Sequence, residues 1–597
     1  MTLTALNIAN FKAFAASQRV PLRPITLIYG ANSAGKSSIL HALALAHHAI
    51  ESGELDTQRT RIGGESIDLG GFRQYVHHRE RERQVELGFE LDPSRLSGRL
   101  AELLGSARNV VVEVAVGLGR STEWFVDLIG MEPPPETLRL LPVLVERFSV
   151  AADGAPLLTM SVRKPRVLQL DRLDHAHPVF REVFRGLVMF ATTTGEVREE
   201  DFNDLGEVLD DLVPGITARC SGLFPRIDNE PEGGKAEGEG REAFVPVSRG
   251  RRREDLARAA RLFLPKAIRD LVDGLGATLE SEIRRLSYLG PLRSYPPRHL
   301  AFSQDQDPNW FAGGGYAWDV VRTDEDTRRR VNKWLGDENR LKTPYELVVR
   351  ELLPASAVAS ELPRKVDKAA HDLTATILGW LGDGDSDLVE LSERLSSELL
   401  EVLEPDDPES MDPEIHNAVS SIVDSEELCE RWIEEIVLDR AETLQDLMLI
   451  DKRTSTVVSH RDVGIGVSQV LPVLVSAFAS KEKILAIEQP EIHLHPALQA
   501  ELGDVFLESA LGNGGNTCLI ETHSEHLLLR IMRRMRETST GELPEGVPKV
   551  RPEDVMVLFV EPDGSRSIIR EMPLNERGEL VKAWPGGFFE EGLREVF

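Results

Sequence analysis

The sequence predicts an α/β fold, and observations at both ends of the chain support this prediction. Near the start, an apolar strand, a glycine-bounded loop and the beginning of a helix follow one another over residues 25–40. Towards the other end, two apolar strands lead into polar residues, at Glu488 and at His523. Strand–loop–helix order is typical of an α/β core. Segments of alternating polarity between these regions predict an additional antiparallel sheet.

Composition limits the number of domains and the kinds of partner. A chain of 597 residues is too long for one ordinary core, so two or three domains are expected. The net charge is −30, so any contact with DNA must come from local basic patches. The three cysteines lie far apart, which argues against a disulfide framework or a zinc site and fits the cytoplasm. We expect no signal peptide and no membrane-spanning segment.

The loop between residues 30 and 37 has the spacing of a phosphate-binding loop. Gly30 and Gly35-Lys36-Ser37 match the pattern G-x-x-x-x-G-K-S, with a strand before and a helix after it. Backbone N–H groups of such a loop surround phosphates, Lys36 supplies charge at the β/γ-phosphates, and the Ser37 hydroxyl is a ligand for Mg²⁺. The sequence therefore predicts a site for ATP and Mg²⁺. The expected nucleotide-contacting residues here are Gly30, Asn32, Ser33, Ala34, Gly35, Lys36, Ser37 and Ser38.

The segments that follow predict an antiparallel sheet beside the nucleotide core. The first helix is expected to run from Lys36 to about Ser52-Gly53. After it, strand periodicity is found in residues 85–91, 110–116 and 124–129. Between the helix and these strands lies Gln74, in a glycine-containing stretch. It is either a loop residue that senses the γ-phosphate or an ordinary polar loop residue, and the sequence leaves both interpretations open.

The middle of the chain, from about residue 166 to residue 445, predicts mainly helices. One helix is expected over residues 255–286, followed by a proline-containing turn at Tyr288–Arg298 with two arginines. Residues 228–253 predict a flexible loop, whose last arginines either contact a phosphate backbone or begin a solvated helix. The acidic segment 404–439 is either a docking face for a basic partner or a solvated helical surface.

Three motifs after residue 446 predict the second half of the nucleotide site. The first is a glycine-containing turn that precedes a helix and forms a second anion site, with Gly464, Gly466, Ser468 and Gln469 as candidates. The second is a Walker B arrangement, an apolar strand that ends in Glu488, a carboxylate placed to hold the Mg²⁺ shell. The third is Cys518–Ser524, in which His523 is placed to reach the γ-phosphate.

This constellation resembles the ABC-type ATPases of the SMC/RecF/OLD class. The Walker B region Ile487-Glu-Gln-Pro-Glu-Ile-His-Leu-His-Pro496 is similar to that of prokaryotic "AAA family" ATPases. The resemblance covers about residues 1–130 and 446–597 and includes Tyr288–Arg298. It implies an ABC-type ATPase head, with a mixed sheet around the phosphate loop, an antiparallel β-subdomain and, here, a large mainly α-helical insertion.

The resemblance also implies that two heads enclose two ATP molecules. The turn with Gly464, Gly466, Ser468 and Gln469 would then be the signature that contacts the γ-phosphate bound to the other copy. A homodimer or a higher homo-oligomer follows. The expected domains are 1–165 and 446–545 for the two halves of the head, 166–445 for the insertion, and 546–597 for a C-terminal β-hairpin tail.

The Walker B region departs from the commonest ABC pattern at the catalytic position. Gln489 stands where the catalytic glutamate usually is, and an amide can orient water but cannot accept its proton. Glu491 is close enough in sequence to serve as the base, and a relay through His493 or His495 is the alternative. We therefore expect slow hydrolysis and a long-lived ATP-bound dimer.

The tail contains no pattern of a nuclease. After His523 come an arginine-rich helix, a predicted hairpin and the aromatic residues Trp584, Phe588 and Phe589, which either plug the tail onto the head or bind a partner. We see no Toprim domain and no carboxylates with two-metal spacing. The sequence favours a regulatory ATPase of a DNA-directed system, such as anti-phage defence, with a separate effector such as a nuclease. A RecF-type repair clamp and an ATP-bound scaffold without hydrolysis are the alternatives.

Overall fold

The structure is a computed structural model that describes most, but not all, of the chain. The described residues are 2–131, 134, 137, 140–191, 206, 208–209, 212–228, 252–293, 309–337, 340–352, 444–458 and 465–588. The chain divides into two compact units, of which one comprises Met1–Tyr345 with Ser459–Phe597 and the other Glu346–Val458. Each unit is described by itself.

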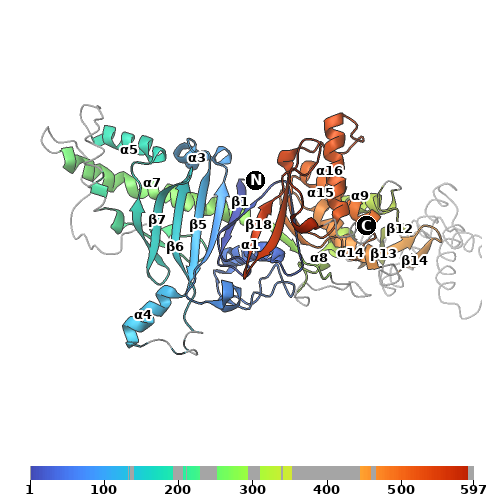
Figure 1. The fold of residues 1–597 in the computed structure, drawn as a ribbon, viewed down its shortest axis with the longest axis horizontal. Coiled ribbons are helices and arrows are strands. Elements are labelled where there is room, and N and C mark those ends of the chain that lie inside the picture. Colours follow the sequence, from blue (N-terminus) through green and yellow to red (C-terminus); the bar gives the residue numbers. More distant parts are fainter. Residues whose placement is uncertain are drawn as a thin grey trace, which may run out of the picture. The chain divides into compact units, whose positions relative to one another are not determined.

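A six-stranded sheet in the first unit joins the two ends of the sequence (Figure 1). Its order is β11-β15-β16-β3-β17-β18, parallel except for the last strand, which pairs antiparallel with β17. The strands are β3 Ile25–Gly30, β11 Leu286–Leu289, β15 Ile484–Glu488, β16 Thr517–Glu521, β17 Val555–Asp563 and β18 Arg566–Glu571. Because parallel strands end at one edge, Gly30, Glu488 and Glu521 all lie at that edge.

The same unit contains a nine-stranded antiparallel sheet of order β10-β9-β8-β7-β6-β5-β4-β1-β2. Its strands are β1 Leu3–Ala9, β2 Gln18–Pro21, β4 Val85–Leu91, β5 Val110–Gly117, β6 Leu144–Ala152, β7 Ala155–Lys164, β8 Val167–Leu173, β9 Thr217–Arg219 and β10 Arg226–Ile227. One face of this sheet is buried under the long helix α7 Arg252–Ile283 (Figure 1).

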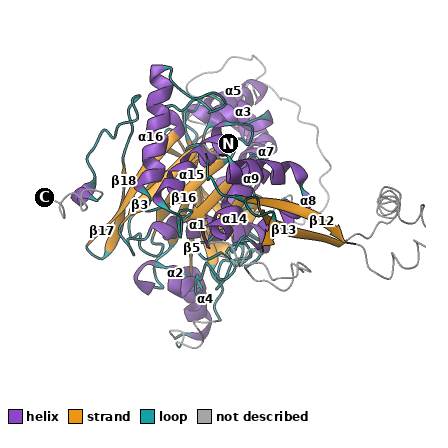
Figure 2. Ribbon diagram, turned by 90° about the vertical axis from the view of Figure 1, so that its right-hand side faces the viewer, coloured by secondary structure: helices purple, strands orange, loops and turns teal. Residues whose placement is uncertain are grey.

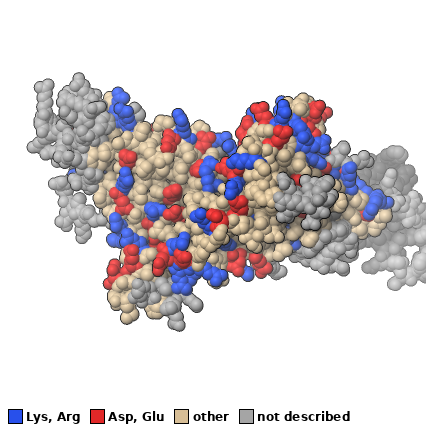
Figure 3. Space-filling view, viewed as in Figure 1, with Lys and Arg blue, Asp and Glu red and all other residues tan. Residues whose placement is uncertain are grey.

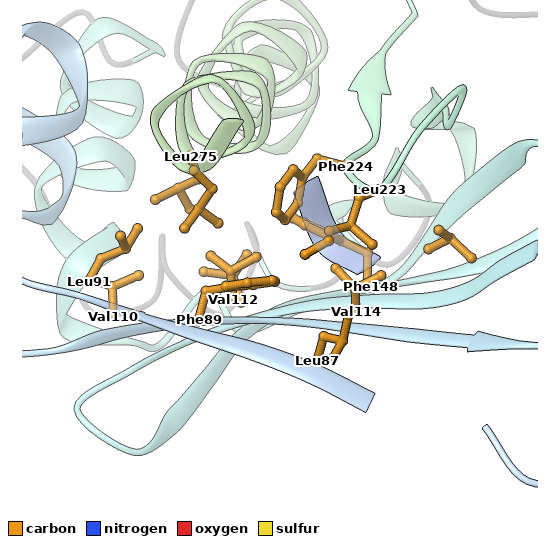
Figure 4. Close-up of a cluster of buried hydrophobic side chains, with 14 of the residues drawn as sticks. Leu87, Phe89, Leu91, Val110, Val112, Val114, Phe148, Leu223, Phe224 and Leu275 are labelled. Carbon is orange, nitrogen blue, oxygen red and sulfur yellow. The ribbon is translucent and has the colours of Figure 1, made fainter. Parts of the chain in front are cut away.

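Alternating side chains of the middle strands form the apolar core beneath α7 (Figure 4). Phe89 of β4 and Phe148 of β6 are fully buried, and the Phe89 ring meets Phe224 edge to face with centroids 5.6 Å apart. Leu275 of α7 reaches the same cluster (Figure 4). Burial of each such side chain stabilises the fold by about 1.5–3 kcal/mol.

Helices cover both sheets, as the view by secondary structure shows (Figure 2). The remaining helices are α1 Lys36–Ser52, α2 Phe72–Tyr75, α3 Gly98–Leu104, α4 Gly119–Ile129, α5 Pro178–Ala191, α8 Gly315–Thr323, α9 Glu325–Gly336, α14 Ile465–Ala479, α15 Pro496–Leu511 and α16 Glu525–Thr540. Short 3₁₀ turns lie at His77–Arg79, Pro93–Arg95, Val213–Gly215, Pro552–Asp554 and Pro585–Gly587. Both α1 and α15 pack against β16 and β3. Among the described helices, none has the length and apolarity that a membrane crossing needs.

The second unit contributes a small sheet of three strands in the order β12-β13-β14. They are β12 Tyr345–Leu352, β13 Leu444–Asp451 and β14 Thr456–Val458, of which the last two pair antiparallel. The acidic segment 404–439, the turn residues 459–464 and most of the predicted loop 228–253 lie outside the described residues.

The mixed α/β fold with an antiparallel β-subdomain is confirmed. The strands predicted at 85–91 and 110–116 are present, α1 ends at Ser52 before Gly53, and α7 and β11 share the predicted stretch 255–286. Trp584 and Phe588 pack on Phe559 of β17, with ring centroids 5.7 and 5.2 Å from it, so this part of the tail plugs onto the head. The predicted domain boundaries stay a prediction.

Two secondary-structure predictions are wrong. Residues 124–129 belong to helix α4, which ends at Gly130 in the left-handed conformation, and not to a strand. Six residues with one aspartate among five apolar side chains cannot distinguish the two by periodicity, and the glycine that ends the helix was the missed signal. The helical pattern does not begin at residue 166, because β8, β9 and β10 continue the nine-stranded sheet. Within Val167–Leu173, Leu168 and Leu170 are buried at a spacing of two, which is strand periodicity, and Leu173 pairs with Leu158 beyond a register irregularity.

Candidate functional site

The phosphate loop connects β3 directly to α1, and its glycines are required by the backbone. At Gly30, φ is +147°, and an added Cβ would lie 2.1 Å from the carbonyl oxygen of Val560 on β17. At Gly35, φ is +95°, and a Cβ would lie 2.5 Å from the Cβ of Ala13. No other residue fits either position without moving the neighbouring chain. The N-terminus of α1 therefore follows a tight loop, which is the geometry that binds anions.

Lys36 and Ser37 begin α1 and point to different partners. The Lys36 ammonium is 4 % exposed and donates to the carbonyls of Gly30, at 3.1 Å, and Ala31, at 3.0 Å. The Ser37 hydroxyl donates to Glu521 Oε2 at 2.7 Å. Burial lowers the pKa of Lys36, against the opposing effect of Glu521.

The other predicted members of the loop divide by exposure. Asn32 and Ser33 are exposed, and Ser33 has a left-handed φ of 61°. Ala34 and Ser38 are buried below the loop. Asn32 and Ser33 thus border the open side of the loop, whereas Ala34 and Ser38 support it from within.

Glu488, at the end of β15, is buried and contacts side chains of β11 and α1. The Tyr288 hydroxyl on β11 donates to Glu488 Oε1 at 2.9 Å. His41 of α1 places Nε2 3.4 Å from the same oxygen, and its Nδ1 lies 2.6 Å from Lys12 Nζ. Burial lowers the pKa of His41 and lowers that of Lys12 to about 8. A chain of polar groups therefore leads from Lys12 to Glu488, the predicted Walker B carboxylate.

Gln489 follows the strand in a left-handed conformation with φ of 44°. Its N–H donates to the carbonyl of Glu521 at 2.7 Å. Arg293 donates from Nη2 to the carbonyls of Glu488, at 3.2 Å, and Gln489, at 3.3 Å. Arg293 Nε and Nη1 are buried without a hydrogen bond in the described part of the chain, and burial lowers the Arg293 pKa to about 10.

Glu491 and His523 face each other across the ends of β15 and β16. Glu491 Oε1 accepts from the His523 N–H at 2.7 Å, and burial raises the pKa of the carboxyl group. Glu491 Oε2 and His523 Nε2 are buried and have no hydrogen bond among the described residues. The pKa of His523 is lowered by burial first and then by the charge of Lys36. His523 is therefore a neutral imidazole close to the phosphate-loop lysine.

The two histidines of the alternative relay are placed differently. His495 is exposed and caps α15, because its Nδ1 accepts from the N–H of Ala497 at 3.3 Å. His493 is exposed with φ of 62°. Of the candidate bases, only Glu491 is buried beside His523.

The predicted signature is only partly described. Gly464 lies outside the described residues, and Gly466 is in the first turn of α14, where an added Cβ would lie 3.3 Å from the carbonyl of His493. Ser468 and Gln469 are buried inside the unit. Gly466 is therefore the described member that is partly open to solvent, and the contact with a second copy stays a prediction.

Sequence reasoning missed several residues of the site. Glu521 had a usable signal, because it ends an apolar strand immediately before the recognised Thr-His pair. Tyr288 and Arg293 lie in a turn that was noted without a role, and only the fold brings them to β15. Gln74 is exposed and borders a cavity of about 730 Å³ together with Lys12, Asp68 and Arg79, so neither of its two interpretations is decided.

The donor set fits Mg²⁺ bound together with a nucleotide. Within the described ranges, no group of three or more His, Cys, Asp or Glu side chains could hold a metal by itself. Mg²⁺ is usually held by one or two carboxylates, water and substrate phosphates, and Ser37 with Glu488 or Glu521 matches that demand. The buried atoms without hydrogen bonds in Arg293, Glu491 and His523 are further places where a polyanion and its water would be accommodated.

Comparisons with protein families identify ATPase sequence in both halves of the chain. Residues 304–530 match the family described as "AAA domain, putative AbiEii toxin, Type IV TA system", and residues 5–110 match a family described as "AAA domain". Residues 550–597 match "Protein of unknown function (DUF3696)". No curated protein matches the chain.

Solved structures of SMC head domains are among the similar folds. The SmcHead bound to the C-winged helix domain of ScpA has 9 % identity and a TM-score of 0.32, covering 96 % of this chain and 99 % of that chain. The SMC head domain from Thermotoga maritima has 7 % identity and a TM-score of 0.31, covering 96 % and 100 %. At such scores these likenesses carry no argument of their own. The two AAA-domain matches thus include the phosphate-loop segment in residues 5–110 and the strands that end at Glu488 and Glu521 in residues 304–530.

Proposed function

We propose that the chain binds ATP, hydrolyses it slowly, and pairs with a second copy through the bound nucleotide. One observation carries this proposal: Lys36 and Ser37 meet His523 and three buried carboxylates, Glu488, Glu491 and Glu521, at one sheet edge. Burying charged groups with incomplete pairing destabilises a protein. Such clusters in a site are therefore typical of ligand binding and catalysis, here beside a phosphate loop.

Each residue has a role in this proposal that its position supports. On nucleotide binding, the Lys36 ammonium replaces its hydrogen bonds to two loop carbonyls by hydrogen bonds to phosphate oxygens. His523 donates a hydrogen bond from Nε2 to the γ-phosphate. Gln489 orients the attacking water, and Glu491 takes its proton through Oε2. A bound Mg²⁺ would supply positive charge at the phosphate oxygens. Hydrolysis is slow because the amide of Gln489 stands in the usual place of a base.

Turnover of the Gln489→Glu variant tests the chemistry. A carboxylate at this position should raise the ATPase rate by at least about 10-fold, since general-base catalysis contributes 10²–10⁴-fold. Glu491→Gln should lower the rate, and Lys36→Ala should weaken ATP binding by about 10- to 100-fold through loss of a charged donor. Fast wild-type turnover that Gln489→Glu leaves unchanged would contradict the proposal.

Mass measurements with and without ATP test the pairing of two copies. Analytical ultracentrifugation of the full chain should show an ATP-dependent dimer, which Lys36→Ala abolishes. Slow hydrolysis should make this dimer persist for many minutes after free ATP is removed. An unchanged mass at saturating ATP would reject the dimer while leaving nucleotide binding intact.

We further propose that the protein is the sensor or regulatory subunit of a DNA-directed defence system in the cytoplasm, with a separate effector. The match to a family described by the AbiEii toxin supports a defence role. Two of the four arginines of helix α16 are engaged with carboxylates of the fold: Arg530 pairs with Glu501 and Asp504, and Arg534 with Asp504 and Glu537. Arg533 and Arg536 are exposed, and Arg533 pairs with Glu537. On the face shown in Figure 3, blue and red side chains are interspersed. Any DNA contact is thus local.

Co-purification with the products of neighbouring genes tests this role. A nuclease or toxin that elutes with the protein in an ATP-dependent manner supports the proposal. Salt-dependent binding of gapped or junction DNA by the protein alone would favour a RecF-type repair clamp instead. Bound nucleotide that never turns over would favour a scaffold.

A further inference from the structure

The Ser37 hydroxyl is bonded to Glu521 and not to the Walker B residue. The Ser37 hydroxyl donates to Glu521 Oε2 at 2.7 Å, and it makes no other side-chain hydrogen bond in the described part of the chain. Glu521 lies opposite Glu488 in the parallel ladder of β15 and β16, and β16 also pairs with β3, which leads into the phosphate loop. Glu521 is therefore the carboxylate on the strand next to the loop, and Glu488 lies one strand further away.

Glu488 is engaged elsewhere. Its Oε1 accepts from the Tyr288 hydroxyl at 2.9 Å and faces His41 Nε2 at 3.4 Å. Both partners approach from β11 and from the second turn of α1, beyond Ser37. The two carboxylates thus have separate partners, although they sit on neighbouring strands.

Glu521 also faces the lysine of the loop. Its Oε1 lies 3.9 Å from Lys36 Nζ, so the two oxygens of one carboxylate face the two functional side chains of the loop. The carboxylate is 4 % exposed, and burial together with the charge of Glu488 raises its pKa to about 7. One long ion contact and one hydroxyl are poor compensation for burying a charge, which argues against a purely structural role.

We propose that Glu521 is a positioning residue of the divalent-metal site: it accepts the hydrogen bond of the Ser37 hydroxyl, so that the lone pairs of the hydroxyl oxygen stay available to a metal. Glu488, held by Tyr288 and His41, would supply a second carboxylate to that metal. The metal site would be shared by carboxylates of two adjacent strands. This inference rests on the proposed ATP-binding function.

Metal-dependent nucleotide binding separates this role from a structural one. Binding of a fluorescent ATP analogue is measured in EDTA and across a Mg²⁺ titration, for wild type, Glu521→Gln, Glu521→Asp and Glu488→Gln. Removal of a residue that orients a metal ligand weakens metal affinity by about 10- to 100-fold, and we expect Glu521→Gln to raise the half-saturating Mg²⁺ by this factor. Binding in EDTA should stay within about twofold of wild type, because Lys36 is retained. Glu521→Asp should recover part of the loss.

The control variant neutralises a buried carboxylate away from the site. Glu90 is buried in the nine-stranded sheet and accepts two bonds from Arg19 at 2.9 Å. Glu90→Gln should lower the thermal midpoint but leave the Mg²⁺ titration unchanged. If Glu521 acts through Ser37, then Glu521→Gln introduced into Ser37→Ala should add no further shift in Mg²⁺ dependence.

The outcomes distinguish an error in the role of Glu521 from an error in the proposed ATP-binding function. A Mg²⁺ curve of Glu521→Gln that coincides with wild type, while that of Glu488→Gln is shifted, overturns the proposed role of Glu521. Full additivity of the Ser37 and Glu521 substitutions does the same. Absence of nucleotide binding by the wild type, or binding by Lys36→Ala at wild-type strength, would overturn the proposed function itself.

Discussion

The two sheets of the first unit differ in how completely their buried charged groups are hydrogen-bonded. In the nine-stranded sheet the interior is apolar, and the buried Glu90 is matched by the forked guanidinium of Arg19. At the edge of the six-stranded sheet, Arg293 and Glu491 are buried and His523 is half-buried, and each has a buried side-chain atom with no hydrogen bond among the described residues. The first region is built for stability, and the second keeps polar groups available for a ligand at the expense of stability. Substitutions in the two regions should therefore differ in what they change.

The largest stability effect should come from the nine-stranded sheet. Phe89→Ala removes a fully buried ring from the core and should lower the free energy of unfolding by about 3–5 kcal/mol. Urea unfolding followed by near-ultraviolet circular dichroism measures it. Leu128→Ala is the control, because Leu128 is 82 % exposed and its truncation should stay within about 0.5 kcal/mol. Equal losses for the two variants would remove the basis of the comparison.

At the sheet edge, a loss of function without a loss of stability is expected. Arg293→Met keeps the length of the side chain but removes a buried guanidinium, whose pKa is lowered by burial to about 10. We expect the free energy of unfolding to change by about 1 kcal/mol or less, since lost carbonyl bonds are offset by relief of desolvation. ATP turnover should fall by at least about 10-fold, because the Gln489 backbone loses its support. A variant that unfolds readily yet keeps its turnover would show that Arg293 belongs to the stabilising region.

The smallest effect concerns Lys12, whose pKa is lowered by burial to about 8. Between this value and that of an unfolded lysine, the unfolded chain binds more protons than the folded chain. Stability attributable to Lys12 therefore rises as pH increases from about 8, by about 1 kcal/mol between pH 7 and pH 9. Lys12→Met should lack this increment in parallel urea titrations at the two pH values. If the free energy of unfolding changes equally between the two pH values in wild type and variant, the burial assigned to Lys12 is contradicted.

The parts of the fold with unambiguous local patterns could be predicted from sequence. Strand β4 alternates in polarity, β5 is a run rich in valine, and the glycines around Lys36 fit a phosphate-binding loop, so these elements could be located to within a residue. The segment that forms α4 was predicted wrongly because its five apolar residues and one aspartate suit either periodicity. Strand β8 is short, and only Leu168 and Leu170 in it show a spacing of two, which is a weak signal.

The residues of the candidate site that stand in local sequence motifs could be predicted. Those that only the tertiary structure brings to the site could not. Lys36, Ser37, Glu488 and His523 stand in recognisable motifs and are at the expected edge. The hydroxyl partner of Ser37 could not be assigned, because two strands end in glutamate and only the sheet order decides which one lies next to the loop. Tyr288 and Arg293 reach the site only through the parallel pairing of β11 with β15.

The position of β3 has a consequence for how the protein is made. This strand, which carries the phosphate loop, has its two neighbours in β16 and β17, so Ile25 pairs with Cys518 on one side and Val555 on the other. During synthesis, some five hundred further residues must leave the ribosome after β3 before β16 or β17 can pair with it. A ribosome that stops before residue 517 releases a chain whose phosphate loop has no sheet to hold it. Truncated chains therefore lack the folded phosphate loop that the proposed nucleotide binding requires.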